Sequence, residues 1–432
     1  PCGGGLGRGV PRAPQPAMSA SSDWAGFAAW AAGPLALSGL ARQRAHDAVI
    51  DTVACLLAGV RTPAARAASA QPAAFRWAVT AHALDFDDYD RPSVGHPSVV
   101  LVPVILALGG SGAAALAAYV AGLEAIDRLG EMVNPEHYER GWHATATLGA
   151  VGAAVAAGRL TVLDARAMLN AMSLAAGHAS GLKAQFGSAG KPLNAGFAAL
   201  HGVMAAQLAQ SGADANSGAL DAFCALYGPD APRSLAGYGD PLAIEQYGLV
   251  VKLWPCCGYL GRILPACIAL SPELTAHDIL QVAVEAPPRN ARVIAYGIPE
   301  TPDQARFSAP YCVAAALLQG GLRPSDFTED AIRRPHILDL ARRVRLVEGT
   351  APQSATDLAA EDPDRLLIEL RDGSRIERVL SALPGSPEMP ATRQQLMAKL
   401  RDCGAGEIEE TLLAFPAMED TGPIRIWLEN RA

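Results

Sequence analysis

Aromatic and charged residues are scarce in this sequence, and their scarcity limits the fold classes open to it. Only 6% of the 432 residues are aromatic and 18% are charged, whereas 50% are hydrophobic. A chain this apolar buries a core easily, which argues against global disorder. Because alanine and glycine are abundant while aromatic residues are few, closely packed helices are favoured over a β-sandwich. The length allows two or three domains.

Several classes of protein are disfavoured by what the chain lacks. The net charge is −8 and no run of lysine and arginine occurs, so no nucleic-acid partner is expected. Eight cysteines are too few for a disulfide scaffold, and without a secretory signal we expect reduced thiols in a cytoplasmic protein. No GxGxxG fingerprint follows a predicted strand, which leaves nicotinamide and flavin chemistry unsupported.

The vicinal cysteines Cys256 and Cys257 do not indicate a metal centre. No Cys-x-x-Cys pair accompanies them. Adding Cys267 gives three thiols, but their spacing matches no iron–sulfur cluster pattern. We therefore expect no metal site.

Two stretches resemble targeting or membrane segments at first sight. Residues 1–17 are rich in glycine and proline, and we interpret them as a disordered tail. Residues 99–123 carry no charge and are long enough to cross a bilayer, but Pro103 and the break at residues 109–112 divide them. We predict two buried helices joined by a tight turn there, and no membrane partner.

Helical periodicity dominates residues 18–255, which we predict to form one helical domain. Hydrophobic residues recur at helical spacing in the segments 40–58, 112–129, 144–158, 162–178 and 194–210. The pattern changes after Pro255, and residues 256–382 are predicted to form a smaller α+β domain. The expected fold class is therefore mainly α with a second α+β domain.

Both strand and helix patterns occur in the smaller domain. Alternating residues predict strands at 281–287, 291–297 and 343–349, and a hairpin over 365–382 with Asp372-Gly373 at its turn. Helical patterns occupy 309–320 and 335–342 and return in the C-terminal segment at 391–403 and 407–414.

Polar residues that can carry chemistry interrupt the apolar helices at three places. The first cluster contains His82, Asp85, Asp87, Asp88, Tyr89 and His96. Carboxylates this close repel each other, so such a cluster indicates a site that requires them. Beside a histidine they can supply general acid–base groups. The alternative is a helix end that runs into a solvated turn.

The second and third clusters each precede a predicted helix. His143 stands just before a helix N-terminus, where anions bind, although a capping or packing role is the alternative. Lys191 lies in a glycine-rich segment that fails the phosphate-loop pattern, because Gly187 and Gly190 are too close and Pro192 replaces Ser or Thr. Lys191 can anchor a carboxylate, and a surface lysine is the alternative.

These segments together resemble the MmgE/PrpD family. HALDFDDYD followed by HPS is similar to the HALDFDD and HPS blocks of that family, and GWHATATLGAVGAA is similar to its G-F-H-x-T segment. FGSAGKPLNAGFAALHG, KLWPCCGY and ARFSAPYCVAAALLQG resemble three further blocks, in the family's order. The blocks span residues 82–320, and their combination is far more specific than any one of them.

The resemblance implies a fold, an assembly and a set of site residues. A large helical domain would be completed by residues 383–432, and the active site would lie between it and the smaller domain. A homodimer without metal or organic cofactor is implied as well. The family's active-site positions fall on Asp85, His96, His143, Lys191, Tyr311 and Cys257.

The sequence also departs from the family's pattern. Tyr89 stands where many relatives have threonine, and Asn194 stands where they have histidine. Cys257 occupies the place of an imidazole in the family's decarboxylases, and the spacing from Asp85 to His96 is one residue longer than theirs.

The implied activity is abstraction of a proton next to a carboxylate of a small polycarboxylate. We expect a hydro-lyase of 2-methylcitrate dehydratase type. The alternatives are an iminodisuccinate-like epimerase, a decarboxylase of the cis-aconitate type, or an inactive scaffold.

Each site residue has an expected role. Lys191 and His143 would bind carboxylates and stabilise charge, with help from Arg306 and with Cys257 beside them. His96 or Asp85 would be the base or acid, and Tyr89 or Tyr311 would donate a proton.

Overall fold

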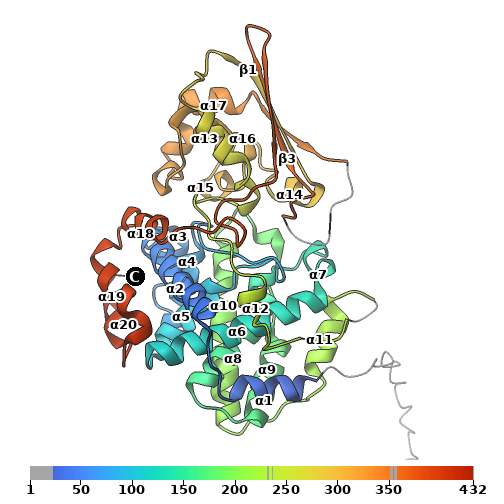
Figure 1. Cartoon of the computed structure of the whole chain (residues 1–432), viewed down its shortest axis with the longest axis vertical. Coiled ribbons are helices and arrows are strands. Elements are labelled where there is room, and N and C mark those ends of the chain that lie inside the picture. Colours follow the sequence, from blue (N-terminus) through green and yellow to red (C-terminus); the bar gives the residue numbers. More distant parts are fainter. Residues whose placement is uncertain (1–22, 231–232, 236, 351–353, 355–357, 432) are drawn as a thin grey trace, which may run out of the picture.

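The computed structural model describes residues 23–230, 233–235, 237–350, 354 and 358–431. The tail expected at residues 1–17 lies outside this described part. The described residues form a large helical body and a smaller α+β part, which is stacked on one end of the body (Figure 1). The chain is therefore mainly helical with a small sheet, as the composition and periodicity predicted.

The helical body is built from the first two hundred or so described residues and from the last forty. Its helices are α1 (Trp24–Ala32), α2 (Gly39–Gly59), α3 (Pro63–Ala68), α4 (Ala73–His82), α5 (Ser98–Leu108), α6 (Gly112–Val133), α7 (Glu136–Glu139), α8 (Ala144–Leu160), α9 (Ala165–His178), α10 (Gly190–Gln210), α11 (Ala219–Tyr227), α12 (Ala243–Gln246), α18 (Arg393–Asp402), α19 (Glu409–Ala414) and α20 (Gly422–Glu429).

The smaller part combines short helices with four strands. Its elements are α13 (Ile263–Leu270), β1 (Ile279–Ala286), α14 (Pro288–Val293), α15 (Pro302–Ala305), α16 (Ala309–Gln319), α17 (Pro335–Ala341), β2 (Val344–Glu348), β3 (Asp364–Leu370) and β4 (Arg375–Leu380). Short 3-10 turns in the described residues are η1 (Lys183–Gln185), η2 (Gly258–Leu260), η3 (Pro324–Asp326), η4 (Ala331–Arg333), η5 (Gly406–Ile408) and η6 (Phe415–Ala417).

The five long helices expected in the body all form. Small residues let them approach closely: Gly122 of α6 lies against Gly152 of α8, where an added Cβ would come within 2.8 Å of a main-chain oxygen. The segment predicted at 194–210 begins earlier, at Gly190, so Lys191 belongs to the first turn of α10. The glycine-rich segment is therefore partly helical.

The uncharged stretch at residues 99–123 forms α5 and the first half of α6, with a turn at Gly109–Ser111. Both helices are largely buried inside the body, as expected. In the described residues, every helix is either too short or too polar to cross a membrane.

The sheet of the smaller part has the strand order β2-β1-β3-β4. β1 pairs in parallel with β2 and antiparallel with β3, and β3 pairs antiparallel with β4. The predicted hairpin is β3 and β4, with Asp372 and Gly373 between the strands. The alternating pattern predicted these four strands because one face of the sheet packs on helices.

The strand predicted at residues 291–297 is wrong. Pro288 begins α14 there, and proline is favoured at the first position of a helix because its φ is already set. Only Ala295 keeps a strand-like contact, a single bridge to Ser308. The alternation of this short segment reflects its burial on one side.

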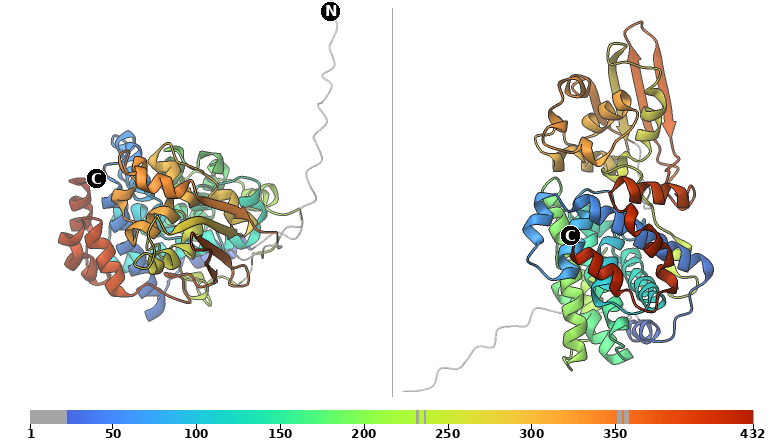
Figure 2. Two further views of the ribbon diagram at one scale, coloured as in Figure 1. Left: turned by 90° about the horizontal axis from the view of Figure 1, so that it is seen from above. Right: turned by 90° about the vertical axis from the view of Figure 1, so that its left-hand side faces the viewer.

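Among the described residues, a large hydrophobic core lies in each part, and a small separate cluster in the body contains Ala64, Ala68, Phe75 and Val79. The core of the body runs from Trp24 to Val251 and resumes from Leu396 to Leu428, so α18, α19 and α20 pack on it. These C-terminal helices lie alongside α2 and the other early helices in both views (Figures 1 and 2). The second core lies between Val250 and Leu383 and includes Tyr89 from the body.

Candidate active site

Residues 83–90, which we call the acid loop, follow the C-terminus of α4 and lie between the two cores. Its four aspartates are buried, from 0% to 3% exposed, so the alternative of a solvated turn is wrong. Asp85 adopts a left-handed backbone conformation with φ of 51°, which aspartate tolerates better than most residues. Such conformations concentrate at functional sites because the surrounding contacts must enforce them.

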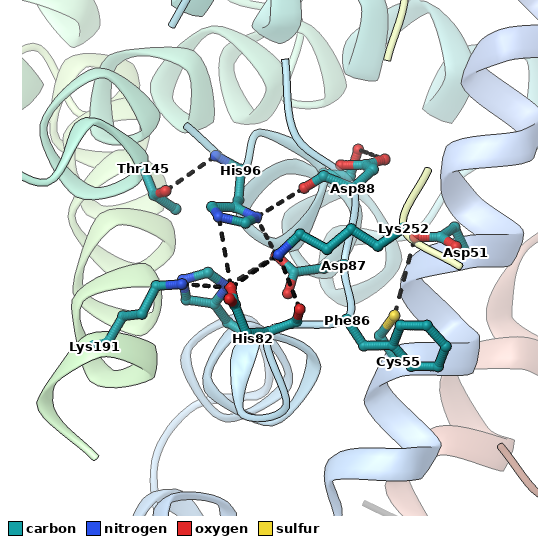
Figure 3. Close-up of polar contacts among 12 residues, drawn as sticks. Asp51, Cys55, His82, Phe86, Asp87, Asp88, His96, Thr145, Lys191 and Lys252 are labelled. Atoms are coloured by element: carbon teal, nitrogen blue, oxygen red, sulfur yellow. Dashed lines mark hydrogen bonds and ion pairs between the residues drawn. The ribbon is translucent and has the colours of Figure 1, made fainter. Parts of the chain in front are cut away.

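Two lysines, Lys191 and Lys252, which Figure 3 labels, converge on the carboxylate of Asp85. Nζ of Lys191 lies 2.5 Å from Oδ1, and Nζ of Lys252 donates to the same oxygen at 3.0 Å and to the main-chain oxygen of Asp85 at 2.9 Å. Burial alone would raise the pKa of Asp85, but the two ammonium groups outweigh it and hold that pKa well below its ordinary value. Asp85 is therefore ionised and forms ion pairs with both lysines.

Asp87 is held between two imidazoles. Its Oδ2 lies 2.8 Å from Nδ1 of His82 and 2.9 Å from Nδ1 of His96. Burial would raise the pKa of Asp87, but the two imidazoles hold it well below the ordinary value. An ionised carboxylate only accepts hydrogen bonds, so both Nδ1 atoms carry their hydrogen.

With the hydrogen on Nδ1, the Nε2 of a neutral His96 carries the free lone pair. Its Nδ1 also lies 2.9 Å from the main-chain oxygen of Asp88, a second acceptor that demands the hydrogen on Nδ1. Burial lowers the pKa of His96 to about 4, although Asp87 acts in the opposite direction. Its Nε2 lies 3.7 Å from Oδ1 of Asp85. A neutral imidazole with this tautomer is suited to accept a proton.

His143 is buried beside His82. Its ring stacks on that of His82 at 5.7 Å and meets the edge of Phe186 at 5.1 Å. Nδ1 lies 3.1 Å from Nδ2 of Asn194, and Nε2 has no hydrogen-bond partner among the described residues. Burial, and then the nearby His82 and Lys191, hold the pKa of His143 well below its ordinary value. Any help to a carboxylate therefore comes from a hydrogen bond rather than from charge.

A cavity of about 40 Å³ opens beside these groups, between the body and the smaller part. Its lining combines the acid loop and nearby helices with residues of the smaller part: Asp85, Tyr89, Val94, Gly95, His96, Tyr138, Phe186, Lys191, Lys252, Cys257, Gly258, Tyr259, Val293 and Phe307. Cations, an imidazole and aromatic rings therefore share one small, partly open space, which is the arrangement expected of a site for a small anion.

The expected site residues divide into three groups by position. Asp85, Tyr89, His96, Lys191 and Cys257 line the cavity, and His143 lies behind it. For Cys257, burial raises the thiol pKa to about 12, so this cysteine is a neutral wall of the cavity rather than a nucleophile.

Tyr311 and Arg306 lie outside the lining. The Tyr311 hydroxyl donates to the main-chain oxygen of Asp326 within the core of the smaller part, so the structure does not bring it to the other residues. Nη1 of Arg306 lies 2.7 Å from Asp303, and the main-chain oxygen of Arg306 accepts a hydrogen bond from the amide of Cys257. Arg306 thus supports the cavity wall, and its guanidinium is already paired.

Sequence reasoning missed Lys252 and the roles of His82 and Asp87. Lys252 is the first residue of the KLWPCC segment, so its place in a recognised block was the available signal. No local pattern indicates that the ammonium group of Lys252 reaches Asp85, because the two residues are 167 positions apart. His82 and Asp87 were noticed as a cluster, but the shared carboxylate oxygen depends on the turn at Asp85.

The ligand atoms of His82, Asp85, Asp87 and His96 lie within 4.8 Å of one another and so could in principle hold a metal ion. The donor set does not fit one well. Both Nδ1 atoms are engaged by Asp87, and Asp85 is already neutralised by two ammonium groups, which would repel a divalent cation at a few ångströms. Nε2 of His82, Oδ2 of Asp85 and Oδ1 of Asp87 have no hydrogen-bond partner among the described residues, but the two ammonium groups beside them disfavour a cation there.

Comparison with known proteins agrees with this architecture. The MmgE/PrpD N-terminal domain matches residues 64–227, and the MmgE/PrpD C-terminal domain matches residues 254–412. The first match covers α4 to α11 of the helical body, and the second covers the smaller part together with α18. The chain belongs to the MmgE/PrpD family.

Its curated relatives include cis-aconitate decarboxylases. That of Homo sapiens is 30% identical over 296 residues, which are 63% of this chain and 60% of the human protein. That of Mus musculus is 27% identical over 76% of this chain and 70% of the mouse protein. That of Aspergillus terreus is 27% identical over 79% of this chain and 78% of the fungal protein. The alignment with the human relative thus spans less than two thirds of its length.

Proposed function

We propose that this protein is a lyase that acts on a small citrate-like polycarboxylate without a metal or organic cofactor. The observation that carries the proposal is the neutral His96, whose Nε2 faces a cavity that also contains the Asp85–Lys191–Lys252 cluster. A base beside paired cations is what removal of a proton next to a carboxylate requires.

The difficulty of this reaction is the charge that develops on the substrate. When a carbon next to a carboxylate loses its proton, the carboxylate takes on a second negative charge. Lys191 and Lys252 would interact more strongly with that dianion than with the starting monoanion, which lowers the barrier. Their burial, at 4% and 6% exposure, strengthens this interaction because little water screens it.

Dehydration of a 2-methylcitrate-like acid is the finer reaction that we propose. His96 accepts the proton from carbon through Nε2, the C–O bond of the hydroxyl on the adjacent carbon breaks, and a C=C bond forms. The departing hydroxide takes a proton and leaves as water. Tyr89 lines the same cavity and is our candidate for that proton donor.

Decarboxylation is the second candidate, and the named relatives favour it. A cis-aconitate-like acid would lose carbon dioxide, and the resulting carbanion would take a proton at carbon. Two imidazoles that the family's decarboxylases use are replaced here, by Cys257 and Asn194, and this is why we place dehydration first.

A two-stage experiment tests the proposal. A thermal-shift screen with citrate, 2-methylcitrate, cis-aconitate and other small di- and tricarboxylates is expected to raise the melting temperature for at least one acid. Proton NMR of the binders in deuterated buffer then separates the reactions. Loss of water with a new alkene indicates dehydration, deuterium in a product with one carboxylate fewer indicates decarboxylation, and exchange alone indicates epimerisation. If no acid stabilises or exchanges, the protein is a scaffold and the proposal is wrong.

A further inference from the structure

The chain uses lysine sparingly, and most of its lysines gather at one place. Of its 35 lysine and arginine residues only four are lysines, at positions 183, 191, 252 and 399. Three of these are buried, between 4% and 6% exposed: Lys191, Lys252 and Lys399. The first two reach Asp85, as described above. Lys399 does not line the cavity and enters from the C-terminal helix α18.

The ammonium group of Lys399 is fully used by three acceptors. Nζ lies 2.6 Å from Oδ1 of Asp51 on α2, 2.7 Å from the main-chain oxygen of Phe86 and 3.0 Å from that of Lys252. An ammonium group carries three hydrogens, so each acceptor can receive one. It also lies 3.8 Å from the centre of the Phe86 ring. Lys399 therefore joins three segments that are distant in the sequence.

Two of these acceptors belong to the candidate active site itself. Phe86 lies between Asp85 and Asp87 in the acid loop, and Lys252 is the residue whose side chain holds Asp85 (Figure 3). The two segments also pair directly: the amide of Tyr89 donates to the oxygen of Val250 at 3.1 Å, and the reverse bond is 2.7 Å. Lys399 thus fixes the main chain on both sides of the Asp85–Lys252 contact.

Asp51 keeps Lys399 charged at this buried position. Burial would lower the pKa of Lys399, but Asp51 outweighs it and raises the pKa above the ordinary value. The packing of α18 does not require the charge, because Leu396 and Leu400 already bury the helix in the body's core. An apolar side chain at this position would leave two main-chain oxygens without their donor.

We propose that Lys399 is a positioning residue of the active site, which holds the acid loop and the Lys252 segment so that Asp85 lies between Lys191 and Lys252. It touches neither the cavity nor, by this proposal, the substrate. Its effect on turnover rests on the proposed function, whereas its effect on the two segments does not.

The main test uses D51N/K399M, which removes both charges of the buried pair and so leaves no uncompensated ion. K399Q is a milder variant, because its amide retains donors for one or both oxygens. R401M is the matched control: Arg401 lies on the same helix, but it is 57% exposed and pairs with Glu409 on the surface. Melting temperatures identify any variant that does not fold.

Two readouts are expected to change together in D51N/K399M. Hydrogen exchange at the amides of Tyr89 and Val250, which report the pairing of the two segments, should accelerate about tenfold or more. With the acid that the wild type converts, kcat should fall about ten- to a hundredfold, because displacement of catalytic groups by about 1 Å has effects of this size. K399Q should lie between, and R401M should match the wild type in both.

The outcomes separate the two proposals. Unchanged exchange at Tyr89 and Val250 in a folded D51N/K399M protein would overturn the positioning role, whatever the turnover. Faster exchange with an unchanged kcat would overturn it as well. If the wild type converts none of the acids, the proposed function fails, and the exchange measurement still decides whether Lys399 orders the two segments.

Discussion

Nε2 of His96 and Oδ1 of Asp85 face each other across 3.7 Å, a separation too long for a hydrogen bond. The imidazole keeps a free lone pair because Asp87 engages its other nitrogen, whereas the carboxylate gives the same Oδ1 to two lysines. We infer that the two residues have different tasks: His96 accepts the proton, and Asp85 places the cations.

Replacement of the candidate base should abolish proton abstraction. We expect H96Q to lower both turnover and the exchange of the substrate's carbon-bound proton in deuterated buffer by about a hundredfold or more, since general bases contribute effects of this size. The measurement is proton NMR with the acid found by thermal shift. H178Q changes an exposed histidine of α9 and should behave as the wild type. Exchange that persists in H96Q would assign the base elsewhere.

The low pKa of His96 predicts how stability and activity depend on pH. Its pKa is about 4 in the folded protein and about 6.5 when exposed, so between these values the unfolded state binds more protons. The contribution of His96 to the free energy of unfolding should therefore be fully present above pH 6.5 and decline as the pH falls to 4. On the acid side, kcat/KM should fall with an apparent pKa near 4. Melting curves of wild type and H96Q between pH 4 and 7 test this, because the variant should show a shallower decline. Parallel curves would contradict the assignment.

Loss of the Lys191 ammonium should weaken substrate binding more than folding. Lys252 still neutralises Asp85 in K191M, so we expect the protein to fold. Because a hydrogen bond to a charged group contributes about 1.5–3 kcal/mol, kcat/KM should fall roughly ten- to a hundredfold. Steady-state kinetics and the thermal shift given by the acid measure this effect. R166M, which alters an exposed charge on α9, serves as control, and a kcat/KM unchanged in K191M would remove Lys191 from the site.

Gly258 leaves room for the ring of Tyr89, and this close packing can be tested. A Cβ at position 258 would lie 2.6 Å from Cε1 of Tyr89, so G258A must displace the ring and should destabilise the protein by about 1–3 kcal/mol. G297A is the control, because a Cβ there meets nothing within 4 Å. Chemical denaturation of G258A, Y89A and the double variant gives the coupling between the two positions. If the two effects simply add, the ring does not depend on Gly258.

Long, periodic segments made most of the helices predictable, because each buries one face and has small residues where a neighbour approaches. α6, α8 and α9 were located from their periodicity within a few residues. The segment at 291–297 failed because its alternation is too short to distinguish a strand from a helix that Pro288 begins. Local patterns carry no information on which of two structures the surrounding core will favour.

The candidate site was predictable where its residues lie in recognisable blocks, and unpredictable where distant segments meet. Asp85, His96 and Lys191 line the cavity, but nothing in the sequence placed Lys252 against Asp85 or Lys399 against Phe86. Tyr311 also lies in a recognisable block, and yet its hydroxyl is engaged inside the smaller part. Motifs identify residue types, whereas the ionisation of Asp85 depends on packing across 100 or more positions of chain. The tautomer of His96 depends on how the acid loop folds around its ring.

The return of the C-terminal helices to the body has a consequence for biosynthesis. Residues 85–88 leave the ribosome early, but the ammonium group that holds their main chain belongs to α18 and emerges more than 300 residues later. During that interval the main-chain oxygen of Phe86 and the buried carboxylate of Asp51 lack the ammonium group that they contact in the folded protein. A nascent chain that already contains every residue of the cavity wall still lacks Lys399. The ordered site should therefore form only when the last tenth of the chain has been translated.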